Sequence, residues 1–285
     1  MIHVNPLKLL LWTFRRNPSD VIDVYNTLSP LMQLATGGKM LNFGYWNGAS
    51  DPFAAQQKLC SLVGDLAGLH SAKKLIDLGS GLGAPAKYWL SKYNPLEVVC
   101  VNINRQQLLE SMRTDGGASR QIDSSVNATS VTLPFPAGTA DRIVALESAQ
   151  HFRPLSEFVK ECRRVLVPGG ILVLAIPVTS IPLRGISKLV KLGILSFTWS
   201  SEHYSADLVK ATLLSHGFRI VELYNIGHEV YEPLTRYYVE NRKSIRERIL
   251  GHYPAYLERV LHRSLLKMER ASEAGLIDYL VIKAA

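Results

Sequence analysis

Residues 75–85 read Leu75-Ile76-Asp77-Leu78-Gly79-Ser80-Gly81-Leu82-Gly83-Ala84-Pro85. The apolar residues before the glycines predict a buried strand, and Pro85 suits the first turn of a helix. Glycines between the two let the backbone turn sharply and approach a ligand without an intervening Cβ. The spacing also fits a dinucleotide-binding fingerprint. The stretch therefore predicts a strand, a ligand-binding loop and a helix in succession.

Apolar strands and helices alternate on both sides of this unit. Strands are expected at residues 74–78, 97–103, 142–146, 171–176, 219–223 and 276–282. Helices are expected at residues 86–92, 106–112, 155–166 and 206–215. Runs of branched apolar residues suit parallel strands that helices cover on both faces. The pattern predicts an α/β fold with a doubly wound, Rossmann-like sheet.

The remaining segments are predicted to be helical and to surround this core. Residues 1–70 form an expected N-terminal helical cap, with one helix around 21–36 and a second that begins after Asp51 as N-cap. Residues 71–285 form the expected core, with lid insertions at about 178–200 and 229–274. The first insertion carries an apolar helical stripe made of Ile186, Leu189, Val190, Ile194 and Phe197. The second is rich in Arg and Lys. The two insertions are interpreted either as a lid over a lipophilic or anionic acceptor that can contact a membrane surface, or as ordinary amphipathic helices with solvated basic faces.

Length and composition exclude several classes of protein. The chain has 285 residues, of which 47% are hydrophobic and 20% charged, so it is not a disordered or low-complexity protein. Its formal net charge of +8 is compatible with an anionic partner. The 3 cysteines include no CxxC pair, which argues against a disulfide framework and a zinc site. We therefore expect a cytoplasmic protein with no metal.

Three features of the sequence favour S-adenosylmethionine over NAD as the cofactor. Asp77 precedes the first glycine by two residues, where a carboxylate can pair with a cationic amino acid moiety but not with a pyrophosphate. The region that usually supplies a ribose-binding acid reads Val101-Asn102-Ile103-Asn104 instead. The third feature is a set of downstream motifs: Leu133-Pro134-Phe135, Ala145-Leu146-Glu147-Ser148 and Leu166-Val167-Pro168-Gly169-Gly170.

As a set, these motifs resemble the class I S-adenosylmethionine-dependent methyltransferases, over roughly residues 20–285. That family implies a seven-stranded Rossmann-like sheet. Residues 41–46 (LNFGYW) and 145–152 (ALESAQHF) are similar to small-molecule methyltransferases of the rebeccamycin sugar O-methyltransferase and sarcosine/dimethylglycine types. Residues 102–107 (NINRQQ) resemble a stretch of the cyclopropane fatty acid synthases.

The resemblance implies a role for individual residues around the cofactor. The methionine and ribose part of the cofactor is implied to be lined by Gly79, Ser80 and Gly81. Its ribose and adenine are implied to contact Asn102, Ile103 and Gln107. Leu146 ends the fourth strand and is implied to lie near the sulfonium. Tyr25 and Tyr45 are implied to close over the cofactor from the N-terminal helices. The usual Gly-Asp-Ala before Leu-Pro-Phe is absent here, so the place of its Asp falls to one of Asn127, Ala128 and Thr129.

His151 is the candidate base for methyl transfer to oxygen. Imidazole is suited to take a proton near neutral pH, and His151 follows the fourth strand at the sheet edge where α/β proteins bind ligands. The sugar O-methyltransferases commonly have an Asp after the fifth strand, but this sequence has Ile176-Pro177 there, so a His–Asp pair is not expected. Glu147 is interpreted as an acid at the start of a helix. His203 is a weaker candidate for the pocket.

The sequence thus predicts methyl transfer from S-adenosylmethionine to a small, lipophilic acceptor, most simply at oxygen. Methylation at carbon or nitrogen of a lipid, isoprenoid or amine is the alternative within the class. An NAD-dependent oxidoreductase and a nucleic-acid-binding protein are more distant alternatives, and no nucleic acid is expected as a partner because no recognition module is present. The oligomeric state is left open.

Overall fold

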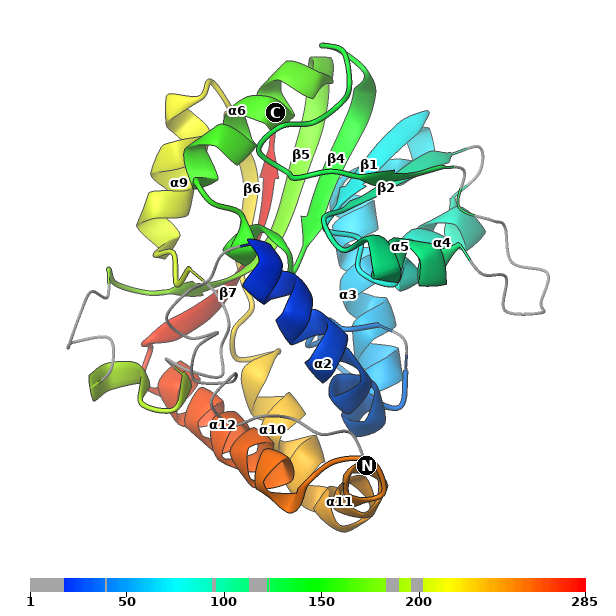
Figure 1. Ribbon diagram of the computed structural model, residues 1–285. Coiled ribbons are helices and arrows are strands. Elements are labelled where there is room, and N and C mark those ends of the chain that lie inside the picture. The colour runs from blue at the N-terminus through cyan, green and yellow to red at the C-terminus, as the bar shows by residue number, and fades with distance from the viewer. Residues whose placement is uncertain are drawn as a thin grey trace.

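A seven-stranded sheet forms the centre of the molecule (Figure 1). The computed structural model describes residues 18–38, 40–93, 96–112, 122, 124–182, 190–195 and 202–285. Within these residues the strands are β1 (Lys74–Leu78), β2 (Glu97–Asn102), β3 (Ser124–Asn127), β4 (Ala140–Leu146), β5 (Leu166–Thr179), β6 (Ile220–Asn225) and β7 (Ile277–Ala284). Their order is β3-β2-β1-β4-β5-β7-β6, and only β7 runs antiparallel to its neighbours. The predicted doubly wound, Rossmann-like sheet is confirmed.

Two strands differ from the sequence-based expectation. β3 was not predicted, because Ser124–Asn127 is polar and only half-buried; it becomes a strand by pairing with β2 at the sheet edge. β5 begins at Leu166, five residues before the expected start. Its register against β4 shifts after Leu166, so that Arg142 of β4 faces Ile171. The Pro-Gly-Gly segment therefore bulges from the strand instead of separating it from the preceding helix.

Helices cover both faces of the sheet. They are α2 (Pro18–Thr36), α3 (Pro52–Leu66), α4 (Ala84–Lys92), α5 (Arg105–Ser111), α6 (Leu155–Val165), α9 (Ala206–Ser215), α10 (Tyr231–Glu240), α11 (Arg242–Leu250) and α12 (Ala255–Glu273), with short 3-10 helices η1 (Leu69–Ser71) and η2 (Ala149–His151). As predicted, Asp51 caps α3, since its carboxylate accepts a hydrogen bond from the backbone N–H of Ala54.

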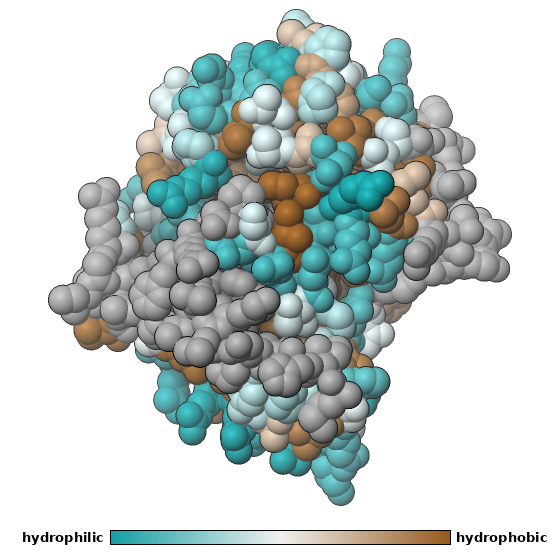
Figure 2. Space-filling view, viewed as in Figure 1, coloured by the Kyte–Doolittle hydropathy of each residue, from teal (hydrophilic) through white to brown (hydrophobic). Residues whose placement is uncertain are grey.

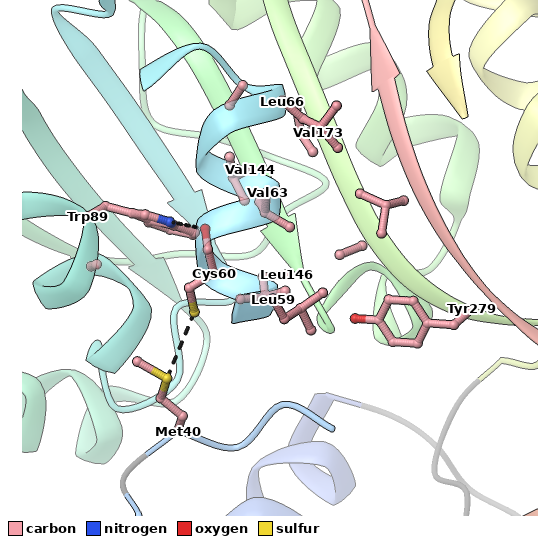
Figure 3. Close-up of a cluster of buried hydrophobic side chains, with 14 of the residues drawn as sticks. Met40, Leu59, Cys60, Val63, Leu66, Trp89, Val144, Leu146, Val173 and Tyr279 are labelled. Carbon is pink, nitrogen blue, oxygen red and sulfur yellow. Dashed lines mark hydrogen bonds between the residues drawn. The ribbon is translucent and has the colours of Figure 1, made fainter. Parts of the chain in front are cut away.

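One face of the sheet packs against α3 and α4 (Figure 3). Leu59 and Val63 of α3 lie against Val144 and Val173 of the central strands, and all four side chains are fully buried. Trp89 of α4 completes the layer by donating a hydrogen bond from its indole N–H to the carbonyl of Cys60. Burial of each such aliphatic side chain contributes about 1.5–3 kcal/mol to stability. The opposite face packs against α6 and α9 in a second apolar cluster.

A third apolar cluster lies beyond the carboxyl ends of the parallel strands. It joins α2 to α10, α11 and α12, which lie together in the lower part of Figure 1. The expected helical cap of residues 1–70 thus divides: α2 belongs to this cluster, whereas α3 covers the sheet. Hydrophilic side chains cover most of the described part of the face seen in Figure 2, with a small apolar area near its centre.

The two segments expected as insertions differ in how they relate to the sheet. Residues 229–274 contain α10, α11 and α12 and so are helical, as predicted, whereas the expected start of the first segment at 178 falls within β5, which ends at Thr179. In the first insertion, Ile186, Leu189 and Phe197 lie outside the described residues. The expected apolar stripe is wrong at Val190, which is 75% exposed, because the turn at 190–195 buries Leu192 and Leu195 instead. No helix in the described ranges is long and apolar enough to cross a membrane.

Candidate active site

The glycine loop turns the chain away from β1 at the carboxyl edge of the sheet. Gly79 and Gly81 have positive φ angles of 74° and 56°, which suit glycine. A Cβ on Gly79 would come within 2.3 Å of the Cβ of Ser148, so this glycine permits close packing against the segment after β4. A Cβ on Gly81 would meet no atom of the described residues within 4 Å, because Gly81 faces open space. The loop therefore opens toward a ligand at Gly81.

That open space is part of a large cavity. It has a volume of about 790 Å³ and extends from the carboxyl edge of the sheet to the helices beyond it. Most of the predicted site residues line it: Tyr25, Asp77, Gly79, Ser80, Gly81, Asn102, Ile103, Gln107, Ala128, Thr129, Leu146 and His151. Residues that were selected from the sequence thus lie together around one cavity.

Tyr45 does not line the cavity, and its predicted contact with the cofactor is not supported by its position. Its backbone N–H donates to the carbonyl of Ala55, and its hydroxyl accepts a hydrogen bond from the Asn47 amide outside the cavity lining. His203, the weaker candidate, is buried away from the lining as well. The sequence pattern does not reveal that Tyr45 and His203 lie outside the cavity lining.

The polar end of the cavity contains a buried carboxyl group beside the glycine loop. Asp77 is 2% exposed, and burial raises the pKa of its carboxyl to about 7. Its Oδ2 atom and the Oγ atom of Ser80 are buried without a hydrogen-bond partner among the described residues. A buried polar atom with no partner is costly unless a ligand satisfies it. The charge and position of these atoms fit the ammonium end of an amino acid such as the methionine part of S-adenosylmethionine.

Amide side chains form the next part of the lining. Asn102, at the end of β2, donates to Gln107 of α5 over 3.0 Å, and Gln107 donates to Ser29 of α2 over 3.4 Å. Asn104 caps α5 and also donates to Asn26 of α2. These bonds hold α2 over the β2–α5 loop, and they present amide groups that suit the hydroxyls of a ribose.

The segment after β3 contributes Ala128, Thr129 and Ser130 to the lining. Asn127, the third candidate for the missing Asp, instead donates its amide to the carbonyls of Asn102 and Ile103. It therefore supports the backbone of the β2–α5 loop from behind.

Glu147 is a cavity residue whose role the sequence analysis missed. It is not a simple helix-start acid: its φ is +48°, a conformation that is rare outside glycine. Its Oε1 atom accepts a hydrogen bond from the backbone N–H of Phe43 over 2.8 Å and from the hydroxyl of Tyr279 over 3.0 Å. Burial, which outweighs these two hydrogen bonds, raises the pKa of Glu147 to about 8. The available signal was its place directly after a central strand.

His151 lies at the junction of the polar and apolar parts of the cavity. η2 carries it past the end of β4, and its Nε2 atom is 2.8 Å from the hydroxyl of Tyr25 on α2. Burial, followed by the charge of Glu147, raises the pKa of the Tyr25 hydroxyl well above its ordinary value. The hydroxyl thus remains protonated and can donate to Nε2 in the tautomer of His151 that leaves this nitrogen unprotonated.

The far wall of the cavity is apolar and is built by α2, α10 and α12. Its side chains include Val21, Leu28, Leu31, Leu234, Leu257, Val260, Leu261 and Leu265. Tyr238 also lines it and donates its hydroxyl to Glu258, a buried carboxylate. Burial raises the pKa of Glu258, but the hydrogen bonds and charge of Arg242 outweigh burial and hold this pKa below its ordinary value. The wall is therefore fixed by an ionised group that does not itself face the cavity.

Comparison with known proteins supports the same family. Residues 76–174 match a family model described as a methyltransferase domain. The chain is 29% identical over 239 residues to erythromycin 3''-O-methyltransferase of Saccharopolyspora erythraea, a match that covers 80% of this chain and 78% of that protein.

Two solved structures are similar in fold. The cyclopropane synthase MmaA2 from Mycobacterium tuberculosis matches with a TM-score of 0.80 and 17% identity, over 94% of this chain and 98% of that one. The mycolic acid cyclopropane synthase CmaA1 complexed with SAH and CTAB matches with a TM-score of 0.76 and 17% identity, over 94% and 98% of the two chains. The match over residues 76–174 includes the glycine loop at the end of β1, and together with the similarity to an O-methyltransferase it supports the expected S-adenosylmethionine-dependent methyltransferase family.

Proposed function

We propose that this methyltransferase acts on a hydroxyl group of a small lipophilic molecule. The observation that carries the proposal is the single cavity that joins the polar glycine-loop end to the apolar wall, with the Tyr25–His151 pair between them. A methyl donor at one end and an acceptor against the other would meet at this pair. The similarity to an erythromycin O-methyltransferase supports an oxygen acceptor.

The proposal assigns the polar end to the cofactor. Asp77 pairs with the ammonium group of the methionine part, and Gly81 lets the backbone lie close to it. The ribose hydroxyls bind the amides of Asn102 and Gln107, and Ala128 and Thr129 border the adenine. S-adenosylmethionine supplies an electrophilic methyl group on a positively charged sulfur. Because this donor is already activated, the protein's contribution is alignment and exclusion of water.

His151 is the proposed base. An acceptor hydroxyl that takes the place of the Tyr25 hydroxyl at Nε2 can pass its proton to the imidazole as its oxygen accepts the methyl group. Tyr25 thus marks the position of the acceptor oxygen, and it covers the site from α2.

The apolar wall selects the acceptor. Among its side chains from α2, α10 and α12 there is no Lys, Arg, Asp or Glu within the described lining. Each aliphatic group of an acceptor that is fully buried there would gain about 1.5–3 kcal/mol of binding free energy. In this proposal α2, α10 and α12, together with Ile194 of the first insertion, form the lid over the acceptor.

The basic residues of α11 are not all available to an anionic surface. Arg242 and Arg246 form ion pairs with the buried Glu258, and Arg248 donates to the carbonyl of Leu34. Part of the positive charge of residues 229–274 therefore stabilises the helical cluster. A peripheral membrane contact remains a secondary proposal that rests on the other basic side chains of these helices.

Replacement of His151 tests the choice of oxygen over carbon or nitrogen. We expect His151→Ala to lower turnover of a hydroxyl acceptor by roughly 10²–10⁴, since general base catalysis typically contributes that much. Affinity for S-adenosylhomocysteine, measured by calorimetric titration, should stay within a few-fold of the wild type. The acceptor can be identified by mass spectrometry of small molecules that co-purify with the chain. Turnover within a few-fold of the wild type would instead favour an amine or carbon acceptor.

A further inference from the structure

Two carboxyl groups face the cavity, that of the buried Asp77 and that of the half-buried Glu147, and no buried Lys or Arg lies beside them in the described lining. Asp77 and Glu147 both line it, and burial raises the pKa of each, to about 7 and about 8. Arg153 is the sole Lys or Arg in the described lining, and it is exposed and paired with Glu202. A carboxyl group with a raised pKa is largely neutral near pH 7, and a positive charge placed beside it favours its ionised form. The cavity therefore offers two carboxyl groups that a positively charged ligand could ionise and pair with.

The two carboxyl groups come from β1 and from the segment after β4, which are neighbours in the sheet. Asp77 belongs to β1 and lies beside the glycine loop. Glu147 follows Leu146 at the end of β4, on the segment that leads to His151. Its charge reaches the Tyr25 hydroxyl, which is bonded to His151. Glu147 is thus the carboxyl group on the side where the methyl group must leave the donor.

The backbone of Glu147 indicates that its placement is specified by the surrounding structure. The residue adopts a positive φ that is unfavourable for a side chain with a Cβ. Its own N–H donates to the carbonyl of Ala175 on β5, and its carbonyl accepts from the Gln150 amide. The hydrogen bonds from Phe43 and Tyr279 then hold the carboxyl group. Four contacts thus maintain a strained residue at the cavity surface, as is common at functional sites.

We propose that Glu147 recognises the positive charge on the donor's sulfur, so that the enzyme binds the charged donor more tightly than the neutral product S-adenosylhomocysteine. The inference rests on the cofactor placement proposed above. Donor and product share the ammonium group that Asp77 meets, and they differ by the methyl group and the charge on sulfur. A carboxylate near that atom would favour donor binding and weaken product binding after transfer.

Calorimetric titration without acceptor tests this assignment. In the wild type we expect higher affinity for S-adenosylmethionine than for S-adenosylhomocysteine. Glu147→Gln keeps an oxygen that can accept from Phe43 and Tyr279 but removes the charge, and it should reduce the donor-to-product affinity ratio roughly 10-fold. Asp77→Asn is the matched control, because it should weaken both ligands by a similar factor. An unchanged ratio in Glu147→Gln, whether both affinities fall or neither does, would overturn the proposal.

Proton release gives a second readout that needs no substitution. Near pH 7 most of the Glu147 carboxyl is protonated in the free protein, and a positive sulfur beside it would drive it to ionise. Titrations in two buffers of different ionisation enthalpy should show more protons released by the donor than by the product. The titratable groups that interact with the charge of Glu147 are Tyr25 of α2, Cys60 of α3, Tyr231 of α10 and Tyr279 of β7.

The outcomes separate this proposal from the proposed function. Equal proton release by the two ligands would contradict the role of Glu147 but leave the acceptor chemistry untouched. If Glu147→Gln does not fold, as judged by thermal unfolding, Tyr279→Phe replaces it: loss of a hydrogen bond that favours the ionised carboxyl should lower the affinity ratio, and an unchanged ratio would count against the proposal. Failure of the wild type to bind either ligand would refute the cofactor site itself.

Discussion

Gly79 and Gly81 stand two residues apart in one loop, but the structure constrains them for different reasons. The space at Gly79 is filled by Ser148, whereas the space at Gly81 is open to the cavity. A side chain at Gly79 would overlap with Ser148, whereas a side chain at Gly81 would occupy cavity space that a ligand would otherwise fill. The same motif thus combines a packing requirement with a binding requirement.

Substitution of the two glycines should separate these requirements. We expect Gly81→Val to abolish binding of S-adenosylhomocysteine in a calorimetric titration, with a loss of stability of only about 1–3 kcal/mol from its positive φ. Gly79→Ala should destabilise the fold more strongly, because its Cβ would overlap with Ser148. Urea unfolding measures the second effect. Wild-type ligand affinity in Gly81→Val would show that the ligand does not approach this part of the loop.

The sequence predicted the position of a site residue where that residue lies near the end of a strand. Asp77 and His151 follow directly from the positions of β1 and β4, since ligands bind at the carboxyl edge of such a sheet. The surroundings of Glu147 and Tyr45 could not be predicted, because they depend on distant parts of the chain. The bond between Phe43 and Glu147 spans 104 residues. No local pattern encodes such a contact.

Helix α12 supplies part of the apolar cavity wall against which the acceptor is proposed to bind. Its residues Leu257, Val260, Leu261, Leu265 and Met268 line the cavity along one face. Leu261 is half-buried, so it can be changed without opening the core.

Replacement of Leu261 by Ser should raise the KM for a lipophilic acceptor roughly 10-fold, because about 1.5–3 kcal/mol of apolar contact is at stake. The KM for the methyl donor should stay within about two-fold of the wild type. Leu214→Ser on α9 is the control, since Leu214 is 57% exposed and lies outside the cavity lining. Steady-state kinetics with both substrates varied provides the measurement. Equal effects of the two substitutions would mean that α12 does not contact the acceptor.

At the level of elements, the sequence predicted most strands and helices because their periodicity is strong. α9 has the predicted bounds of residues 206–215, and β1 those of 74–78. β3 was missed because its polar residues lack the alternation of a half-buried strand, and only pairing with β2 makes it one. The register shift in β5 likewise depends on its partner β4. Local sequence does not specify features such as these, which depend on pairing with a neighbouring strand.

For the whole molecule, the two carboxyl groups that face the cavity predict a stability that depends on pH. Asp77 and Glu147 have pKa values near 7 and 8 in the folded chain, above their ordinary values of 3.8 and 4.5. The folded state therefore binds more protons than the unfolded state, and their contribution to stability is complete below about pH 4 and lost as the pH rises through 7 and 8.

The variant with both Asp77→Asn and Glu147→Gln should lack this loss. Between pH 5.5 and 8.5, the free energy of unfolding of the ligand-free wild type should fall relative to that of the variant by an amount on the order of 5 kcal/mol. Urea unfolding at both pH values measures the difference, and other titrating groups cancel in the comparison. Parallel pH profiles for the two proteins would contradict the raised pKa values.

The position of β7 has a consequence for how the protein is made. β7 lies between β5 and β6 and is the only partner of β6 in the described sheet. During synthesis β6 emerges from the ribosome well before β7, so it waits without a partner while α10, α11 and α12 follow. Until then the open edges of β5 and β6 expose unpaired backbone, which is the kind of surface that chaperones bind and that promotes aggregation. The described sheet is complete only when β7 enters between β5 and β6, which are both synthesised before it.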